Sequence, residues 1–140
     1  MTISNESILL VEDDDSVRAV LARGLARLGY HVLCARDGEH ALSIADEFRA
    51  PIHLVISDVA MPVMNGVQLF ERLRGWYPSI RFLFISGYSR PRIMVEDGSD
   101  AATGFLQKPF TLAELAGRGR ALLERPRARR TEPRLRAMAG

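Results

Sequence analysis

The sequence predicts an α/β fold in which a doubly wound, five-stranded parallel sheet is covered by five helices. Short apolar runs of strand length alternate with longer amphipathic stretches of helical period through most of the chain. This alternation is typical of parallel sheets, whose right-handed crossovers place helices on both faces. A chain of 140 residues is also long enough to bury one such core without disulfides or structural metals.

Composition favours a cytoplasmic globular protein. Hydrophobic residues make up 47% of the chain and charged residues 26%, which is ordinary for a globular domain. No apolar run approaches the length of a membrane span, and the polar start MTISNES is not a signal peptide. The single cysteine, Cys34, lies in an apolar stretch, so we expect it to be a small core residue in a reducing compartment.

Charge is divided unevenly along the chain. Residues 125–140 contain six arginines and one glutamate, whereas residues 1–124 carry a net charge of −3. The high pI therefore reflects the C-terminal end and does not indicate nucleic-acid binding by the folded part. We expect an N-terminal extension over 1–6, one domain over 7–125 and a basic, disordered tail over 126–140. For this tail, a solubilising role is favoured over partner binding.

In the first half, predicted strands are short apolar runs and predicted helices have apolar residues at three- and four-residue steps. Residues 8–11 predict a buried strand, closed by the acidic residues 12–15. A helix over 16–28 follows and ends at Gly29, with an apolar stripe formed by Val17, Val20, Leu21, Leu25 and Leu28. The next elements are a strand over 31–35, a turn at Asp37-Gly38, a helix over about 39–48 and a strand over 54–56 that ends at Ser57-Asp58.

The second half continues the alternation with one poorly patterned segment. A loop over 61–66 leads into a helix over about 67–75, and a strand over 81–85 ends at Ser86-Gly87. Residues 89–103 predict only a short or irregular helix. A strand over 105–107 follows, and then Thr111 and Glu114 form a capping box for a helix that carries Leu112, Leu115, Leu122 and Leu123.

Five polar residues fall at one edge of this sheet, because the carboxyl ends of parallel strands meet there. Glu12 and Asp13 follow the first strand and Asp58 ends the third. Ser86 ends the fourth strand, and Lys108, the only lysine, ends the fifth. Ligands of open α/β sheets bind outside this edge, so we expect the functional site here.

Three carboxylates at one edge repel each other unless a cation lies between them. Mg²⁺ is the cation that fits an all-oxygen site of this kind, with Mn²⁺ as a substitute. Asp13 and Asp58 are the best direct ligands, and Glu12 can act through water. The backbone carbonyl of Ala60, in the loop after Asp58, can add another ligand.

A carboxylate beside Mg²⁺ can accept a phosphoryl group. Lys108 would supply an ammonium group and Ser86 a hydroxyl donor to the charged phosphoryl oxygens, while Gly87 leaves access for a donor. Taken singly, these residues also suit a solvated helix start, a turn or a surface lysine. Their joint position at the ends of four strands favours the functional interpretation.

This pattern resembles the response-regulator receiver family over about residues 7–125. The motifs that carry the resemblance are ILLVEDD, LVISDVAMPVMNG, FISGYS and FLQKPF, and the last two are similar to receivers of hybrid histidine kinases. The resemblance implies a flavodoxin-like fold with strand order 2-1-3-4-5. It also implies a phosphoacceptor at Asp58, a metal-binding pair at Glu12 and Asp13, a switch hydroxyl at Ser86, the family's lysine at Lys108 and an aromatic switch position at Phe105.

By this resemblance the protein is a signalling switch that takes a phosphoryl group from a histidine kinase or a histidine phosphotransfer protein. Ser86 and Phe105 would then move inward and alter the face near the fourth helix and the fourth and fifth strands, and so control an unidentified protein target. Phe105 suits a plain core aromatic equally well. Ala60 and Tyr88 occupy positions that influence water attack in receivers, and Ala60 favours a long-lived phosphoryl group.

Two other function classes stay open at this point. A degenerate receiver that binds partners without phosphorylation would not need all five edge residues. A phosphohydrolase with an aspartate nucleophile resembles a DxD pattern, but Ala60 leaves no second acid to protonate a leaving group. Only sixteen residues follow Glu124, too few for a DNA-binding or catalytic domain. The chain is therefore expected to be either a stand-alone receiver, which Met1 and the C-terminal tail favour, or a receiver excised from a larger chain. We expect it to be monomeric or weakly dimeric.

Overall fold

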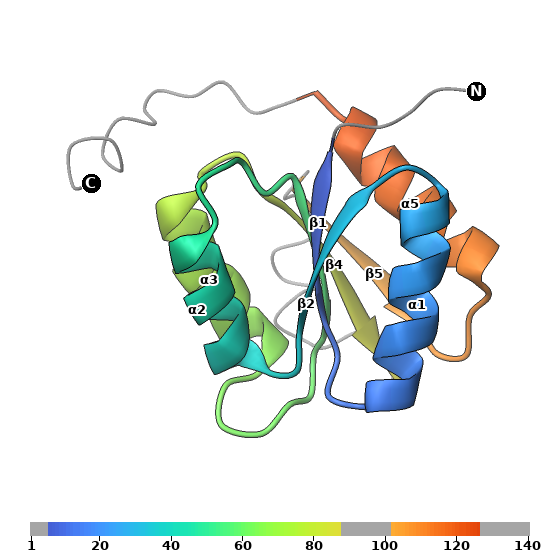
Figure 1. The fold of residues 1–140 in the computed structure, drawn as a ribbon, viewed down its shortest axis with the longest axis horizontal. Coiled ribbons are helices and arrows are strands. Elements are labelled where there is room, and N and C mark those ends of the chain that lie inside the picture. Colours follow the sequence, from blue (N-terminus) through green and yellow to red (C-terminus); the bar gives the residue numbers. More distant parts are fainter. Residues whose placement is uncertain (1–5, 88–101, 127–140) are drawn as a thin grey trace.

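A computed structural model describes residues 6–87 and 102–126 (Figure 1). In chain order the elements are β1 (Ser7–Val11), α1 (Asp15–Arg27), β2 (His31–Ala35), α2 (Gly38–Glu47), β3 (Leu54–Asp58), α3 (Gly66–Trp76), β4 (Arg81–Ser86), β5 (Thr103–Gln107) and α5 (Leu112–Glu124). Most predicted elements are confirmed within one or two residues. Of the irregular helix expected over 89–103, residues 89–101 lie outside the described residues, while Ala102 is in a turn and Thr103 begins β5.

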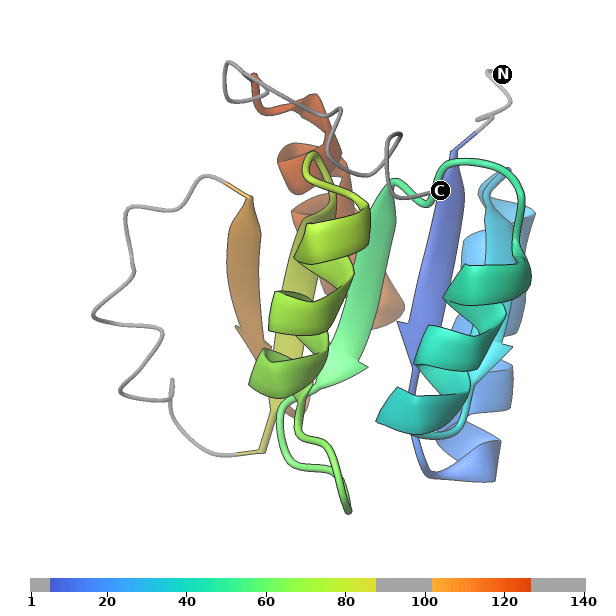
Figure 2. The ribbon, with the colours of Figure 1, turned by 90° about the vertical axis from the view of Figure 1, so that its left-hand side faces the viewer.

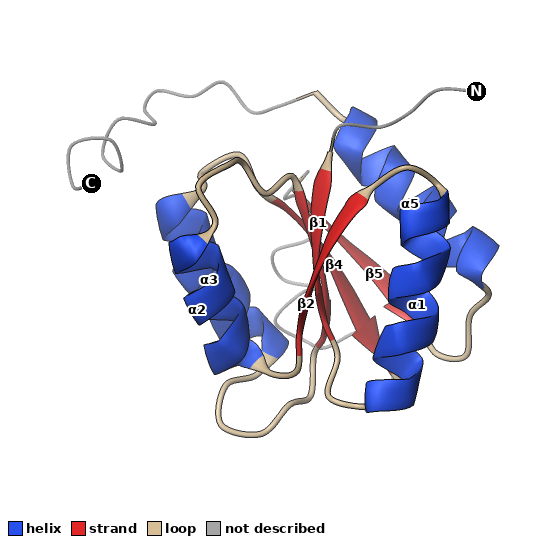
Figure 3. Ribbon diagram, viewed as in Figure 1, coloured by secondary structure: helices blue, strands red, loops and turns tan. Residues whose placement is uncertain are grey.

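The five strands form one parallel sheet in the order β2-β1-β3-β4-β5, as predicted. Helices α2 and α3 cover one face and α1 and α5 cover the other (Figures 1 and 2). The central strands are covered on both sides, and Figure 3 shows them between the two helical layers. Because helices cover both faces, β1 and β4 are buried throughout. This burial explains why their sequences are mostly continuous apolar runs and not alternating ones.

Alternation along each strand divides the core into two clusters. Leu9, Val55 and Phe82 point to the α2–α3 side, where they pack against Ala41, Ala45, Leu69, Phe70 and Leu73. Residues Ile8, Leu10 and Ile56 point to the other side and pack against Leu21, Leu25, Leu115 and Leu122. Because neighbouring side chains enter opposite clusters, the pairing register of the strands is fixed, and with it the position of every strand end.

Helix starts are capped by short polar side chains. Asp14, Asp37, Asn65 and Thr111 each accept a hydrogen bond from a backbone N–H of the first turn. The capping box predicted at Thr111 and Glu114 is present, and a second one joins Asn65 and Gln68. These caps satisfy N–H groups that have no partner inside the helix, so they fix where each helix begins.

Two expectations about burial are wrong. On α1 only Leu21 and Leu25 are buried, whereas Val17, Val20 and Leu28 are exposed, because one sheet face covers a narrower stripe than the sequence pattern suggested. Cys34 is also exposed, not a core residue. It lies on β2, which is at the edge of the described sheet and pairs there with β1 alone, so its apolar sequence neighbours do not predict full burial.

Substitution of Gly66 should damage the strand end that carries Asp58. A Cβ atom at Gly66 would lie 2.4 Å from the backbone oxygen of Asp58, and a backbone atom cannot move aside as a flexible side chain can. We expect Gly66→Ala to lower the free energy of unfolding by about 1–3 kcal/mol, measured by urea denaturation. Gly117→Ala is the matched control: within the described residues, no atom beyond its own helical backbone and chain neighbours lies within 4 Å of its Cβ position in α5, so it should stabilise by about 0.5–1 kcal/mol. Equal stability of the Gly66 variant and the wild type would contradict this account.

Candidate acidic site at the carboxyl edge of the sheet

The predicted polar residues meet at the carboxyl edge of the sheet. Parallel register places Asp58 beside Ile85 of β4 and Ser86 beside Gln107 of β5. Glu12 directly follows β1, and its backbone N–H donates to the Ala35 carbonyl of β2 at 3.1 Å. The side chains therefore come from four different strand ends, each held by the ladder of the sheet.

Three carboxylates come together at this edge. Oxygen atoms of Glu12, Asp13 and Asp58 lie within 4.8 Å of one another. Glu12 and Asp58 are buried, with exposed fractions of 3% and 6%, while Asp13 is exposed. Because Asp13 is exposed to solvent, a cation can reach the two buried carboxylates from that side.

Lys108 supplies positive charge at this site. Its Nζ lies 3.1 Å from Oδ1 of Asp58 and 3.9 Å from Oε1 of Glu12. The backbone N–H of Lys108 donates to the Ser86 carbonyl at 2.8 Å, and a cis peptide bond joins Lys108 to Pro109. Burial opposes the ammonium charge, but the contacts with Asp58, then Glu12 and Asp13, outweigh it and raise the pKa of Lys108 above its ordinary value.

One lysine does not offset three carboxylates. Burial, aided by the nearby Asp58, raises the pKa of Glu12 from its ordinary 4.5 to about 7, against the opposing effects of the Asp14 backbone N–H and of Lys108. The environment of Glu12 therefore disfavours its charged form. An oxygen-only donor set that is short of positive charge and open on one side fits a hard divalent cation such as Mg²⁺.

The remaining predicted residues surround this cluster. Ser86 is buried at the end of β4, and Gly87 beside it is exposed. Ala60 lies exposed in the loop after β3, where its carbonyl stays a predicted ligand. Phe105 is half-buried on β5 and packs against the core cluster on the α2–α3 side. Tyr88 lies outside the described residues.

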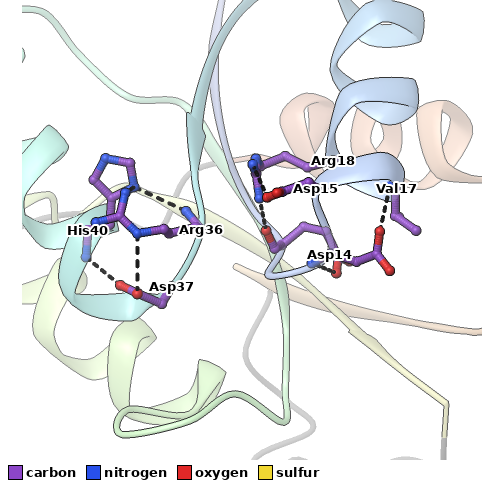
Figure 4. Close-up of polar contacts among 8 residues, drawn as sticks. Asp14, Asp15, Val17, Arg18, Arg36, Asp37 and His40 are labelled. Carbon is purple, nitrogen blue, oxygen red and sulfur yellow. Dashed lines mark hydrogen bonds and ion pairs between the residues drawn. The ribbon is translucent and has the colours of Figure 1, made fainter.

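Sequence reasoning missed the residues that hold the acidic ones in place. Ser57 donates from its hydroxyl to the Asp58 carbonyl at 2.9 Å. Arg18 donates to the Glu12 carbonyl at 2.8 Å and to Asp15 at 2.6 Å. Figure 4 shows Arg18 with Asp15, and the Asp37–His40 helix cap beside them. A helix-start arginine carries no sequence signal for such a contact, because the direction of its side chain decides it.

Comparison with known proteins places the chain in one family. The model of the response regulator receiver domain matches residues 8–119. The sensor kinase CckA of Brucella abortus is 42% identical over 119 residues, which cover 85% of this chain and 13% of that protein. The response regulator receiver protein CpdR of the same organism is 32% identical over 108 residues, covering 77% of this chain and 88% of that protein.

Other relatives and solved structures agree. The transcriptional regulatory protein PrrA of Mycobacterium tuberculosis is 37% identical over 123 residues, covering 88% of this chain and 52% of that protein. The crystal structure of the receiver domain of the hybrid histidine kinase CckA has a TM-score of 0.71 at 42% identity, covering 84% of this chain and 99% of that one. The chemotaxis protein CheY4 of Vibrio cholerae has a TM-score of 0.74 at 31% identity, covering 85% and 99%.

The chain thus spans a small part of the sensor kinase and about half of the transcriptional regulator that it resembles. The match nevertheless covers nearly the whole length of the solved receiver domains. Among the helices that the structure describes, none is both long and apolar enough to cross a lipid bilayer.

The raised pKa of Glu12 predicts a pH dependence of stability. The folded protein holds the Glu12 proton more tightly than the unfolded chain, so this stabilisation is present below pH 4.5 and is lost as pH rises to about 7. In a metal-free buffer with chelator, the free energy of unfolding of the wild type should therefore fall as the pH rises through this range. We expect the fall to be about 1–3 kcal/mol smaller in Glu12→Gln, measured by urea unfolding at several pH values. Glu71→Gln, at an exposed α3 position, is the control and should keep the wild-type slope. An unchanged slope in Glu12→Gln would contradict the assignment.

Sheet order, the convergence of acidic residues with Lys108, and the family match over most of the folded part all agree. The chain belongs to the response regulator receiver domain family and is a receiver domain of two-component or phosphorelay signalling.

Proposed function

We propose that this receiver accepts a phosphoryl group on Asp58 from a phosphohistidine, with Mg²⁺ held by the acidic cluster, and thereby changes its binding surface. The partner that supplies the group is a histidine kinase or a histidine phosphotransfer protein. The observation that carries the proposal is the environment of Asp58. Its buried carboxylate lies 3.1 Å from the Lys108 ammonium and within 4.8 Å of two further carboxylates.

The acidic residues are suited to hold the cation. Asp13 and Asp58 would contact it directly, Glu12 through water, and the Ala60 carbonyl would complete the oxygen set. When bound, the ion supplies positive charge beside the phosphoryl oxygens. Mn²⁺ has the same preference for oxygen ligands and would substitute for it.

The chain's own residues perform the transfer around Asp58. Its carboxylate oxygen forms a bond to phosphorus while the phosphorus–nitrogen bond of the phosphohistidine breaks, and the imidazole takes the electron pair. Lys108 stays within reach of the carboxylate and balances charge on the transferred group. The Ser86 hydroxyl, at the end of the adjacent strand, donates to a phosphoryl oxygen.

The same residues link the phosphoryl group to the surface. In the ladder, Ser86 pairs with Gln107 and Phe84 pairs with Phe105, so Phe105 lies two residues from the partner of Ser86. When Ser86 moves toward the phosphoryl group, Phe105 turns into the space that it leaves. The surface near β4 and β5 then changes shape and contacts a downstream protein. The protein acts as a switch of this kind and not as an enzyme with turnover.

Intact mass after incubation with acetyl phosphate and Mg²⁺ tests the proposal. We expect a gain of one phosphoryl group, no gain with chelator present, and no gain in Asp58→Asn, which keeps the side-chain shape but lacks the nucleophilic oxygen.

Because the short Ala60 side chain cannot orient water, the phosphoryl group should persist for minutes or longer, and Ala60→Asn should shorten its half-life.

Asp13→Asn serves as the second arm. It leaves the acceptor in place and removes one proposed direct ligand, so more Mg²⁺ should be needed for the same rate. If the wild type gains no mass from acetyl phosphate or from a phosphorylated histidine phosphotransfer protein, the chain is instead a receiver that binds partners without phosphorylation.

A further inference from the structure

Arg18 lies beside the acidic site and forms a two-sided contact. It is in the first turns of α1, and its guanidinium turns back toward the end of β1 (Figure 4). Nη1 donates to the backbone carbonyl of Glu12 at 2.8 Å, and Nη2 donates to Oδ1 of Asp15 at 2.6 Å. The Arg18 side chain is 20% exposed, whereas that of Asp15 is 87% exposed. The arginine is therefore mostly covered while its acidic partner is open to solvent.

This contact completes the fixation of Glu12. The backbone N–H of Glu12 donates to Ala35 at 3.1 Å, and its carboxylate oxygen Oε2 accepts from the Asp14 N–H at 2.9 Å. With Arg18 on its carbonyl oxygen, each polar group of Glu12 has a partner. The Glu12 carbonyl belongs to the peptide group that leads into Asp13, so Arg18 also fixes the orientation of that peptide group.

Asp13 depends on this peptide group. Within the described ranges, no hydrogen bond holds its exposed carboxylate directly. Its direction is therefore set by the backbone that precedes it and by the capped start of α1 that follows it. The Asp15 carboxylate fixes the plane of the Arg18 guanidinium, and the other half of that rigid fork reaches the Glu12 carbonyl.

An ordinary surface ion pair does not account for this arrangement. An exposed arginine–aspartate pair three residues apart on a helix contributes only a few tenths of a kcal/mol. Here the second half of the fork binds a main-chain carbonyl next to a metal-binding pair, and a free ion pair has no reason to take that geometry.

We propose that Arg18 is a positioning residue for the divalent cation: it holds the Glu12–Asp13 peptide so that the Asp13 carboxylate faces Asp58. This inference rests on the proposed function. The direction of the change in cation affinity on substitution of Arg18 distinguishes a positioning role from a purely electrostatic effect. Removal of a positive charge near a cation site should strengthen cation binding if charge alone matters, whereas loss of positioning should weaken it.

Metal binding without a phosphodonor gives the test. Mn²⁺ affinity is measured by electron paramagnetic resonance, with Mg²⁺ as competitor, for the wild type, Arg18→Gln and Arg18→Lys. We expect both variants to bind roughly tenfold more weakly. Arg18→Lys keeps the positive charge but lacks the two-pronged guanidinium. If Arg18→Gln does not fold, Arg18→Lys by itself still tests the positioning role. Arg23→Gln removes an exposed arginine from the same helix and should leave the affinity unchanged.

A second readout separates positioning from a general loss of structure. The rate of phosphorylation by acetyl phosphate is measured against Mg²⁺ concentration. The half-saturating concentration should rise in both Arg18 variants while the maximal rate stays within about twofold of the wild type. Urea unfolding checks that the variants are folded at the temperature used.

The outcomes are distinct. Unchanged or tighter binding in Arg18→Gln, or unchanged binding in a folded Arg18→Lys, would overturn the positioning role. A wild type that binds neither ion would instead overturn the proposed function on which this inference rests.

Discussion

The structure depends on a shortage of positive charge at one sheet edge. Three carboxylates have oxygen atoms within 4.8 Å of one another, and the Lys108 ammonium lies 3.1 Å from one of them. Two of the three are almost fully buried, so water cannot screen their repulsion. The raised pKa of Glu12 is the direct consequence of this burial. A site of this kind is ready for a cation and for an anionic group that brings its own oxygens, which is the chemistry that phosphoryl transfer needs.

The fold tolerates this charge because the sheet holds each acidic residue by its backbone. Asp58 is the last residue of a strand with partners on both sides, and Gly66 approaches its carbonyl closely enough to exclude a side chain. Glu12 is fixed through its N–H, its carbonyl and its carboxylate. The apolar clusters on both faces fix the register of the strands, so repulsion at the edge cannot be relieved by sliding one strand past another. Core packing thus holds the carboxylates close together against their mutual repulsion.

The sequence predicted the strand order and the meeting of the five edge residues because both follow from where apolar runs end in a parallel sheet. It predicted the Thr111 cap because the spacing to Glu114 is a local signal. It did not predict the exposure of Cys34 or of Val20, since burial depends on which strand lies at the edge and how much of a helix the sheet covers. It also missed Ser57 and Arg18, whose contacts depend on side-chain direction. The structure shows where the predicted site residues lie, and their roles, from the phosphoacceptor Asp58 to Ser86, Phe105 and Ala60, stay predictions.

A carbon-detected NMR titration of the Glu12 carboxyl group, with and without Mg²⁺, tests the charge balance at this sheet edge. Without the ion, we expect a midpoint near 7, because burial and the neighbouring Asp58 disfavour the charged form. With saturating Mg²⁺, the midpoint should fall toward or below the ordinary value of 4.5, because the cation offsets the repulsion. A midpoint already near 4.5 without the ion would contradict the electrostatics described for this edge, and a midpoint that Mg²⁺ does not move would contradict the proposal that a divalent cation binds there.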